Sequence, residues 1–116
     1  MEELAARHTA ADMAALRALQ QQAEQAARQS VSAFAEALFR YHRGVTFLSG
    51  NTITPLIFNA FATVNLEFWK EYIQVTGIDR CLERLGQFTA YIEAGEGQRA
   101  SGLLRYGLEQ FIGQMR

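Results

Sequence analysis

Apolar residues recur at steps of three and one over the last part of the chain, and this pattern restricts the possible fold most strongly. They are Ala100, Leu103, Leu104, Gly107, Leu108, Phe111, Ile112 and Met115. Such steps give the broad apolar stripe of a helix that packs on a core. The pattern predicts a helix over residues 98–115 with this stripe facing inward.

Further helices are predicted from similar patterns and from capping residues. Thr9 and Asp12 resemble a capping box. Ser30 or Ser32 can cap the next helix, and Gly50 can end it. No segment alternates apolar and polar side chains as a β-strand does, so we predict an all-α antiparallel helical bundle of about five helices. The expected helices cover residues 10–28, 30 or 32 to 48, 52–75, 80–94 and 98–115, and residues 1–7 resemble the end of another helix.

Two of these helices carry predictions about the core. Phe34, Leu38, Tyr41, Val45 and Leu48 share one face of the second helix. The third helix, which Asn51 can cap, has apolar side chains on nearly every side, and we expect it in the middle of the bundle. Its apolar residues are Ile53, Leu56, Ile57, Phe58, Phe61, Val64, Phe68, Trp69, Tyr72 and Ile73.

Length, charge and cysteine content exclude several classes of protein. With 116 residues, 49% of them hydrophobic, residues 1–116 are expected to form a single domain. A net charge of -1 argues against nucleic-acid binding, which depends on clustered basic residues. One cysteine excludes an internal disulfide. The uncharged stretch 44–66 contains a turn and is not a membrane span, so we expect a cytoplasmic protein with no membrane partner.

Residues suited to catalysis or metal binding are sparse. The chain has two histidines, His8 and His42, without the spacing of a metal site, and no nucleophile motif, so no catalytic residue, metal or cofactor is predicted. Cys81 is expected near a helix start, where its thiol is either packed or activated by the helix dipole. His42, Tyr72 and Tyr106 can each be core residues or pocket walls. Gly107 can serve close helix packing or leave room for a ligand.

Several short segments occur in the order found in one known family. They are Phe34-Ala35-Glu36, residues 41–51 (YHRGVTFLSGN), Ile92-Glu93-Ala94-Gly95-Glu96 and Leu104-Arg105-Tyr106-Gly107. The chain therefore resembles the FCD effector domain of GntR-type bacterial regulators, and within it the fatty-acid regulator (FadR) subfamily. The resemblance implies a helical ligand-binding and homodimerisation domain that follows a winged helix-turn-helix. That DNA-binding part is absent, so an N-terminally truncated domain without DNA binding of its own is expected.

Many FCD domains bind a metal through one Asp and three His residues. At the corresponding positions this chain has Leu38, His42, Leu85 and Gly107. One ligand of four remains, so the resemblance predicts no metal and argues against the small carboxylic acids that such metals help to bind.

The resemblance also implies a set of ligand-binding residues by position: His42, Tyr72, Tyr106, Gly107 and Glu109. The implied ligand is a fatty acyl-CoA or another acyl or apolar metabolite held in the bundle. A ligand-free helical dimerisation or interaction protein derived from such a domain is the alternative. A core filled with aromatic side chains would favour the alternative, and an open cavity would favour the ligand-binding domain.

Overall fold

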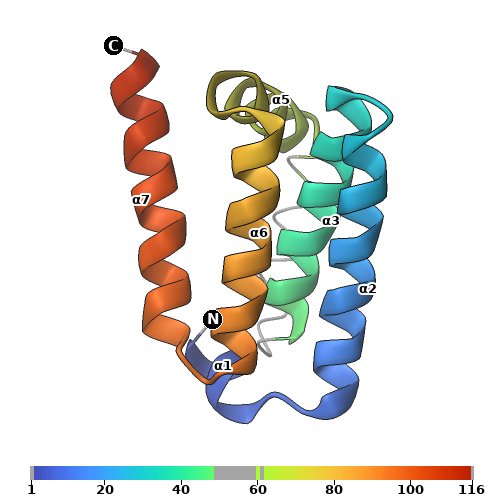
Figure 1. Cartoon of the computed structure of the whole chain (residues 1–116), viewed down its shortest axis with the longest axis vertical. Helices are drawn as coiled ribbons and strands as arrows, with labels where there is room; N and C mark the ends of the chain where they lie inside the picture. Colours follow the sequence, from blue (N-terminus) through green and yellow to red (C-terminus); the bar gives the residue numbers. More distant parts are fainter. Residues whose placement is uncertain (1, 49–59, 61, 116) are drawn as a thin grey trace.

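The computed structural model describes residues 2–48, 60 and 62–115, and these form helices without strands. Figure 1 shows α2, α3, α6 and α7 as long helices, with α1 near one end and α5 across the other. This confirms the predicted all-α bundle. Six helices are described: α1 (Glu2–Arg7), α2 (Ala10–Ala27), α3 (Val31–Leu48), α5 (Ala62–Thr76), α6 (Ile78–Glu93) and α7 (Gly97–Met115).

Local capping explains where α2 and α3 begin. Thr9 and Asp12 form the predicted capping box, since the Asp12 amide donates to Thr9 Oγ1 (3.1 Å) and the Thr9 amide donates to the Asp12 carboxylate (3.0 Å). The Ala33 amide donates to Ser30 Oγ (3.0 Å), so Ser30 rather than Ser32 caps α3. Gly50 and Asn51, which were predicted to end one helix and to cap the next, lie outside the described residues.

Glycines make the two turns that flank α6. Gly77 has φ +96° and Gly95 has φ +78°, a backbone region that favours glycine. Because Gly77 itself precedes the first turn, α6 begins at Ile78, two residues before the predicted start. At the other end of α6, an ideal Cβ on Gly95 would lie 3.7 Å from the Ala5 carbonyl oxygen, so the two segments are close together.

The core is built around α3. Phe34, Leu38, Tyr41 and Val45 are buried, as the predicted stripe required. The expectation that the third predicted helix lies in the middle is wrong over its described part. There α5 buries Trp69, Tyr72 and Ile73, whereas Val64 is 67% exposed. The physical reason is position: α5 lies across one end of the bundle, so neighbours cover one side of it (Figure 1). Its apolar residues 53–58 and 61 lie outside the described residues.

A buried hydroxyl pair ties α3 to α6. Thr89 donates to the Leu85 carbonyl (3.1 Å), so the Tyr41 hydroxyl donates to Thr89 Oγ1 (2.6 Å). Both side chains are almost completely buried, and burial raises the pKa of Tyr41 to about 12. The pair therefore satisfies polar groups that would otherwise be costly inside the core.

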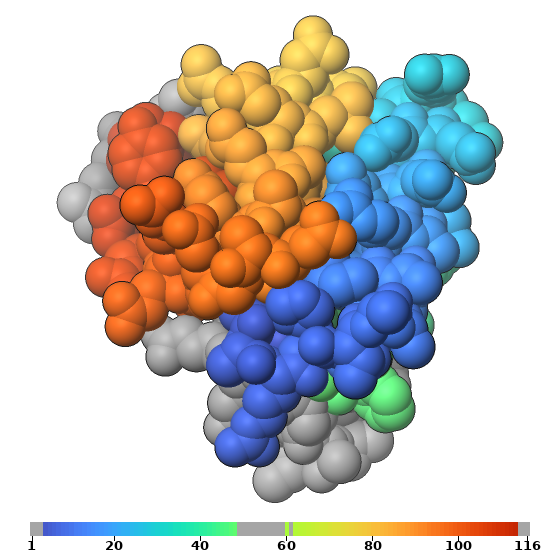
Figure 2. All heavy atoms as spheres, turned by 60° about the horizontal axis from the view of Figure 1, so that its bottom comes forward, coloured from blue at the N-terminus to red at the C-terminus, as the bar shows by residue number. Residues whose placement is uncertain are grey.

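The last helix contacts α6, α5 and the short α1. Ala100, Gly107 and Phe111 of α7 are buried, in line with the predicted stripe. Ile112, which belonged to that stripe, is 50% exposed, because neighbouring helices cover only part of the stripe's width. Figure 2 shows the N-terminal residues against the α6–α7 connection, where Leu4 and Ala5 are buried. In the described part of the chain, no helix has the length and apolarity needed to span a membrane.

Candidate functional site

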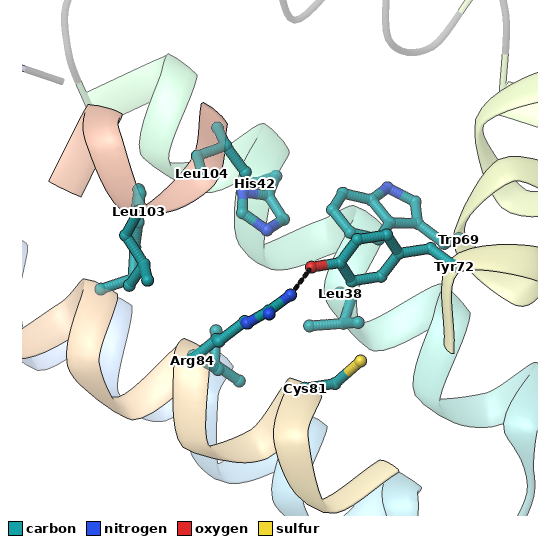
Figure 3. Close-up of a pocket in the computed structure, with 10 residues that line it drawn as sticks. Leu38, His42, Trp69, Tyr72, Cys81, Arg84, Leu103 and Leu104 are labelled. Atoms are coloured by element: carbon teal, nitrogen blue, oxygen red, sulfur yellow. Dashed lines mark hydrogen bonds between the residues drawn. The ribbon is translucent and has the colours of Figure 1, made fainter. Parts of the chain in front are cut away.

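A small cavity of about 40 Å³ lies where α3, α5, α6 and α7 meet. Figure 3 shows the Arg84 side chain pointing toward Tyr72, with His42 and Trp69 on neighbouring walls. A volume of this size holds roughly three water molecules. The described lining residues are Leu38, His42, Trp69, Tyr72, Cys81, Arg84, Leu85, Phe88, Leu103 and Leu104.

Arg84 connects three helices at this cavity. From α6, its Nη1 donates to Tyr72 Oη on α5 (2.9 Å), and its Nη2 donates to Gln110 Oε1 on α7 (2.8 Å). Both acceptors are neutral, and none of the described carboxylates lies within ion-pair distance of this arginine. The cavity therefore has a partly buried positive charge without a negative partner among the described residues.

Aromatic rings form the opposite wall. The His42 ring stacks on Trp69, with centroids 4.8 Å apart and planes 6° apart, and meets the edge of Phe88 at 5.7 Å. Removal of the ring from water lowers the pKa of His42 to about 4. At neutral pH the imidazole is therefore uncharged, and it can both donate and accept a hydrogen bond.

A larger groove of about 520 Å³ adjoins the cavity. His42, Trp69 and Leu104 line both spaces, so these three side chains separate the small cavity from the groove. Most lining residues are apolar, and the volume is within the roughly 300–1,000 Å³ of small-molecule sites. The described residues are His42, Val45 and Thr46 of α3, Val64, Asn65, Phe68 and Trp69 of α5, and Leu104 and Leu108 of α7.

The lowered pKa of His42 predicts a pH-dependent stability. Unfolded His42 takes up a proton near pH 6.5, whereas folded His42 does so only near pH 4, so the unfolded state binds more protons between these values. The free energy of unfolding should therefore fall by about 1–2 kcal/mol as the pH drops from 6.5 to about 5. Urea unfolding at several pH values measures this loss.

The matched variants for this experiment are His42→Gln and His8→Gln. The first should remove the loss, and the second should keep it, because His8 lies outside the cavity and its Nδ1 contacts the Ala5 carbonyl. If the free energy of unfolding depended on pH equally in the wild type and in His42→Gln, the loss of stability could not be assigned to His42.

The structure brings three of the five sequence-predicted site residues together. His42 and Tyr72 line the cavity, and Gly107 lies directly behind the Arg84–Tyr72 pair. A Cβ on Gly107 would be 2.7 Å from Tyr72 Oη and 3.1 Å from Arg84 Nη1. Tyr106 is 55% exposed, and Glu109 is also exposed; neither is among the residues that line the cavity or the apolar groove.

Tyr106 instead belongs to an outer polar groove of about 430 Å³ between α6 and α7. Its hydroxyl accepts a hydrogen bond from Gln110 Nε2 (2.8 Å), and the Arg84 guanidinium carbon lies 5.8 Å from its ring centroid. Arg84 lines both this groove and the inner cavity, so its side chain separates the two.

Sequence reasoning missed Arg84. A signal was present, because Arg84 lies three residues after Cys81 and four before Phe88, two buried positions on the same face of α6. A charged residue on the apolar face of a helix requires a polar partner or a ligand. The partners, Tyr72 and Gln110, come from other helices, so the sequence could not identify them.

The other chemical groups near the site have ordinary structural roles. Burial raises the pKa of the Cys81 thiol to about 11, against a smaller opposing effect from the nearby Arg84 charge. The thiol is therefore packed and protonated, and the interpretation as an activated thiolate is wrong. Within the ranges that the structure describes, no three His, Cys, Asp or Glu side chains lie close enough to hold a metal ion.

Comparison with protein families gives one finding for this chain. Residues 1–110 match the FCD domain family. The match covers nearly all of the 116 residues, including every described residue that lines the cavity. Neither the curated proteins nor the solved structures contain a match to the chain.

Proposed function

Because the chain belongs to the FCD domain family, we propose that it is the ligand-sensing and dimerisation domain of a GntR-type transcription regulator of the FadR subfamily. FCD domains are regulatory effector-binding domains and not a catalytic family. The proposed ligand is a small apolar or acyl-type metabolite, such as a fatty acyl-CoA. DNA binding belongs to a separate domain of the regulator.

The observation that carries this proposal is the apolar groove between α3, α5 and α7 next to the cavity at Arg84. An apolar chain can lie along Val45, Phe68 and Leu108 in the groove, and its polar end can lie beside His42 and Trp69, which also line the cavity. Apolar lining with a few convergent polar groups is the usual composition of a small-molecule site. The position of Gly107 behind the cavity supports its assignment to the site.

The proposed mechanism is a shift between helix arrangements. Arg84 holds α5 and α7 against α6 in this structure. A ligand among these helices stabilises whichever arrangement binds it more tightly. In a dimeric regulator, the altered arrangement of α7 and α5 then changes how the DNA-binding domains are placed.

One observation favours the alternative, a ligand-free dimerisation or interaction protein. The rings of Tyr41, His42, Trp69, Tyr72 and Phe88 fill much of the space around the cavity and leave about 40 Å³. An acyl chain does not fit in that volume, so a ligand must use the larger groove. Occupancy of the groove therefore discriminates between the two functions.

The fluorescence of Trp69 tests this directly, because Trp69 is the single tryptophan of the chain and lines both the groove and the cavity. Octanoate and octanoyl-CoA, each titrated into the protein, are the probes. We expect at least one to change the emission saturably with one site per chain. If neither changes it, the ligand-free alternative replaces the proposal.

Two variants of α7 provide a matched control. Leu108 lines the groove, whereas Ile112, one turn later, is half exposed and is not among the residues that line it. Leu108→Asn should weaken binding about tenfold, because it places a polar amide against the apolar part of the ligand. Ile112→Asn should leave the affinity unchanged, and equal weakening in both variants would place the ligand elsewhere.

A further inference from the structure

The cavity can be reached from two sides of its described wall. Most of the side chains that line it are buried, and the partly exposed ones are His42, Arg84, Leu103 and Leu104. His42 and Leu104 also line the apolar groove, whereas Arg84 and Leu103 also line the outer polar groove. A solute therefore enters either past the first pair or past the second.

A chain of hydrogen bonds closes the side that faces the outer groove. Arg84 Nη1 donates to Tyr72 Oη (2.9 Å) inside the cavity, as Figure 3 shows, and Arg84 Nη2 donates to Gln110 Oε1 (2.8 Å) on α7. Gln110 Nε2 in turn donates to Tyr106 Oη (2.8 Å), and Tyr106 is 55% exposed. The chain therefore runs from the cavity to the surface and connects α5, α6 and α7.

The two sides differ in what it costs to open them. On the apolar side, the His42 ring stacks on Trp69, and separating the rings would expose apolar surface to water. On the polar side, the bonds of Arg84 are exchanged for bonds to water, and the net cost of each is small. The outer groove also contains the exposed carboxylate of Glu83, which can receive the guanidinium there. The polar side should therefore open more readily.

We infer that Arg84 acts as a gate: its hydrogen bonds to Tyr72 and Gln110 close the cavity, and small solutes enter from the outer polar groove when these bonds open. The inference goes beyond the proposed function, because it concerns access to the cavity and not the ligand. Opening also releases α6 from α5 and α7, so access and the arrangement of these helices change together.

Cys81 reports on the gate, because it is the single cysteine, lines the cavity and is 4% exposed. The probe is methyl methanethiosulfonate, a small neutral reagent that adds only a thiomethyl group, and mass spectrometry measures the rate of labelling. In the wild type this rate should be slow and nearly constant at low urea concentrations, because a local opening exposes little surface. Labelling through global unfolding would instead accelerate steeply with urea.

Two glutamines of the outer groove give matched variants. Gln110→Ala removes the acceptor of Arg84 Nη2 and keeps the charge of Arg84, so labelling of Cys81 should become roughly tenfold faster. Gln87 lines the same groove from α6, and Gln87→Ala should be labelled at the wild-type rate.

A third variant removes both bonds of the gate. Arg84→Met should be labelled at least as fast as Gln110→Ala. The Arg84 charge lowers the pKa of the Cys81 thiol, so its loss makes the thiol less reactive. Faster labelling in this variant therefore reports easier access and not a more reactive thiol.

Three results would overturn the gate. The first is equal labelling of Gln110→Ala and Gln87→Ala, and the second is a wild-type rate that rises steeply from the lowest urea concentrations. The third is faster labelling in Leu104→Ala but not in Gln110→Ala, which would place the entrance on the apolar side. Because no ligand is used, failure of the gate leaves the proposed function intact. Failure of octanoate and octanoyl-CoA to bind would likewise leave the gate intact.

Discussion

Replacement of Phe34 by alanine is expected to lower the free energy of unfolding by about 3–5 kcal/mol. Phe34 is completely buried on the core face of α3, near the N-terminal end of the helix. The loss combines the transfer of the ring to water with the cavity left among its neighbours. Since small domains have a total stability of about 5–15 kcal/mol, this variant should be close to unfolding. Urea denaturation followed by circular dichroism measures the change.

Phe47→Ala is the matched control, because it removes the same side chain from the same helix. Phe47 is 65% exposed, so its loss should change the stability by less than about 1 kcal/mol. Similar effects of the two substitutions would contradict the assignment of the core to the Phe34 face of α3.

Gly107→Leu has the largest expected effect on ligand binding. A side chain at this position meets Tyr72 Oη and Arg84 Nη1 at once, and its outer atoms enter a cavity of about 40 Å³. We expect octanoate binding to weaken by roughly a hundredfold or more, which corresponds to about 2.7 kcal/mol. The helical circular dichroism signal should persist, since leucine favours helices more than glycine does.

Gly102 offers the control within the same helix. No atom lies within 4 Å of an ideal Cβ at Gly102, so Gly102→Leu should bind octanoate as the wild type does. Unchanged affinity in Gly107→Leu would remove Gly107 from the site. Equal loss in both variants would mean that substitution in α7 acts through the helix as a whole.

Most of the fold could be predicted because helices are specified locally. The capping box of Thr9 and Asp12, the cap at Ser30 and the stripe from Phe34 to Val45 depend on residues close in sequence, and the structure confirms them. Which apolar faces are covered is not a local property. Val64 and Ile112 continue apolar stripes but remain exposed, because no neighbouring helix reaches them in the described structure.

The candidate site was predictable only in part, for the same reason. His42 and Tyr72 lie beside apolar stripes, and their position in the family pattern indicated a cavity, which they do line. Arg84 was missed because its role depends on oxygens from two other helices, at distances set by packing. Tyr106 shares a helix with Gly107 but faces the outer groove, since adjacent residues of a helix point in different directions.

Native mass spectrometry of protein purified without added ligand tests the central claim, that this chain is a dimeric ligand-binding domain. We predict a dimer that carries a discrete additional mass per chain, released on denaturation and identified as an apolar or acyl-type compound. Where the dimer is empty, added octanoate should appear as one bound molecule per chain. A dimer that stays empty with octanoate and octanoyl-CoA, or a monomer without bound ligand, would contradict the account.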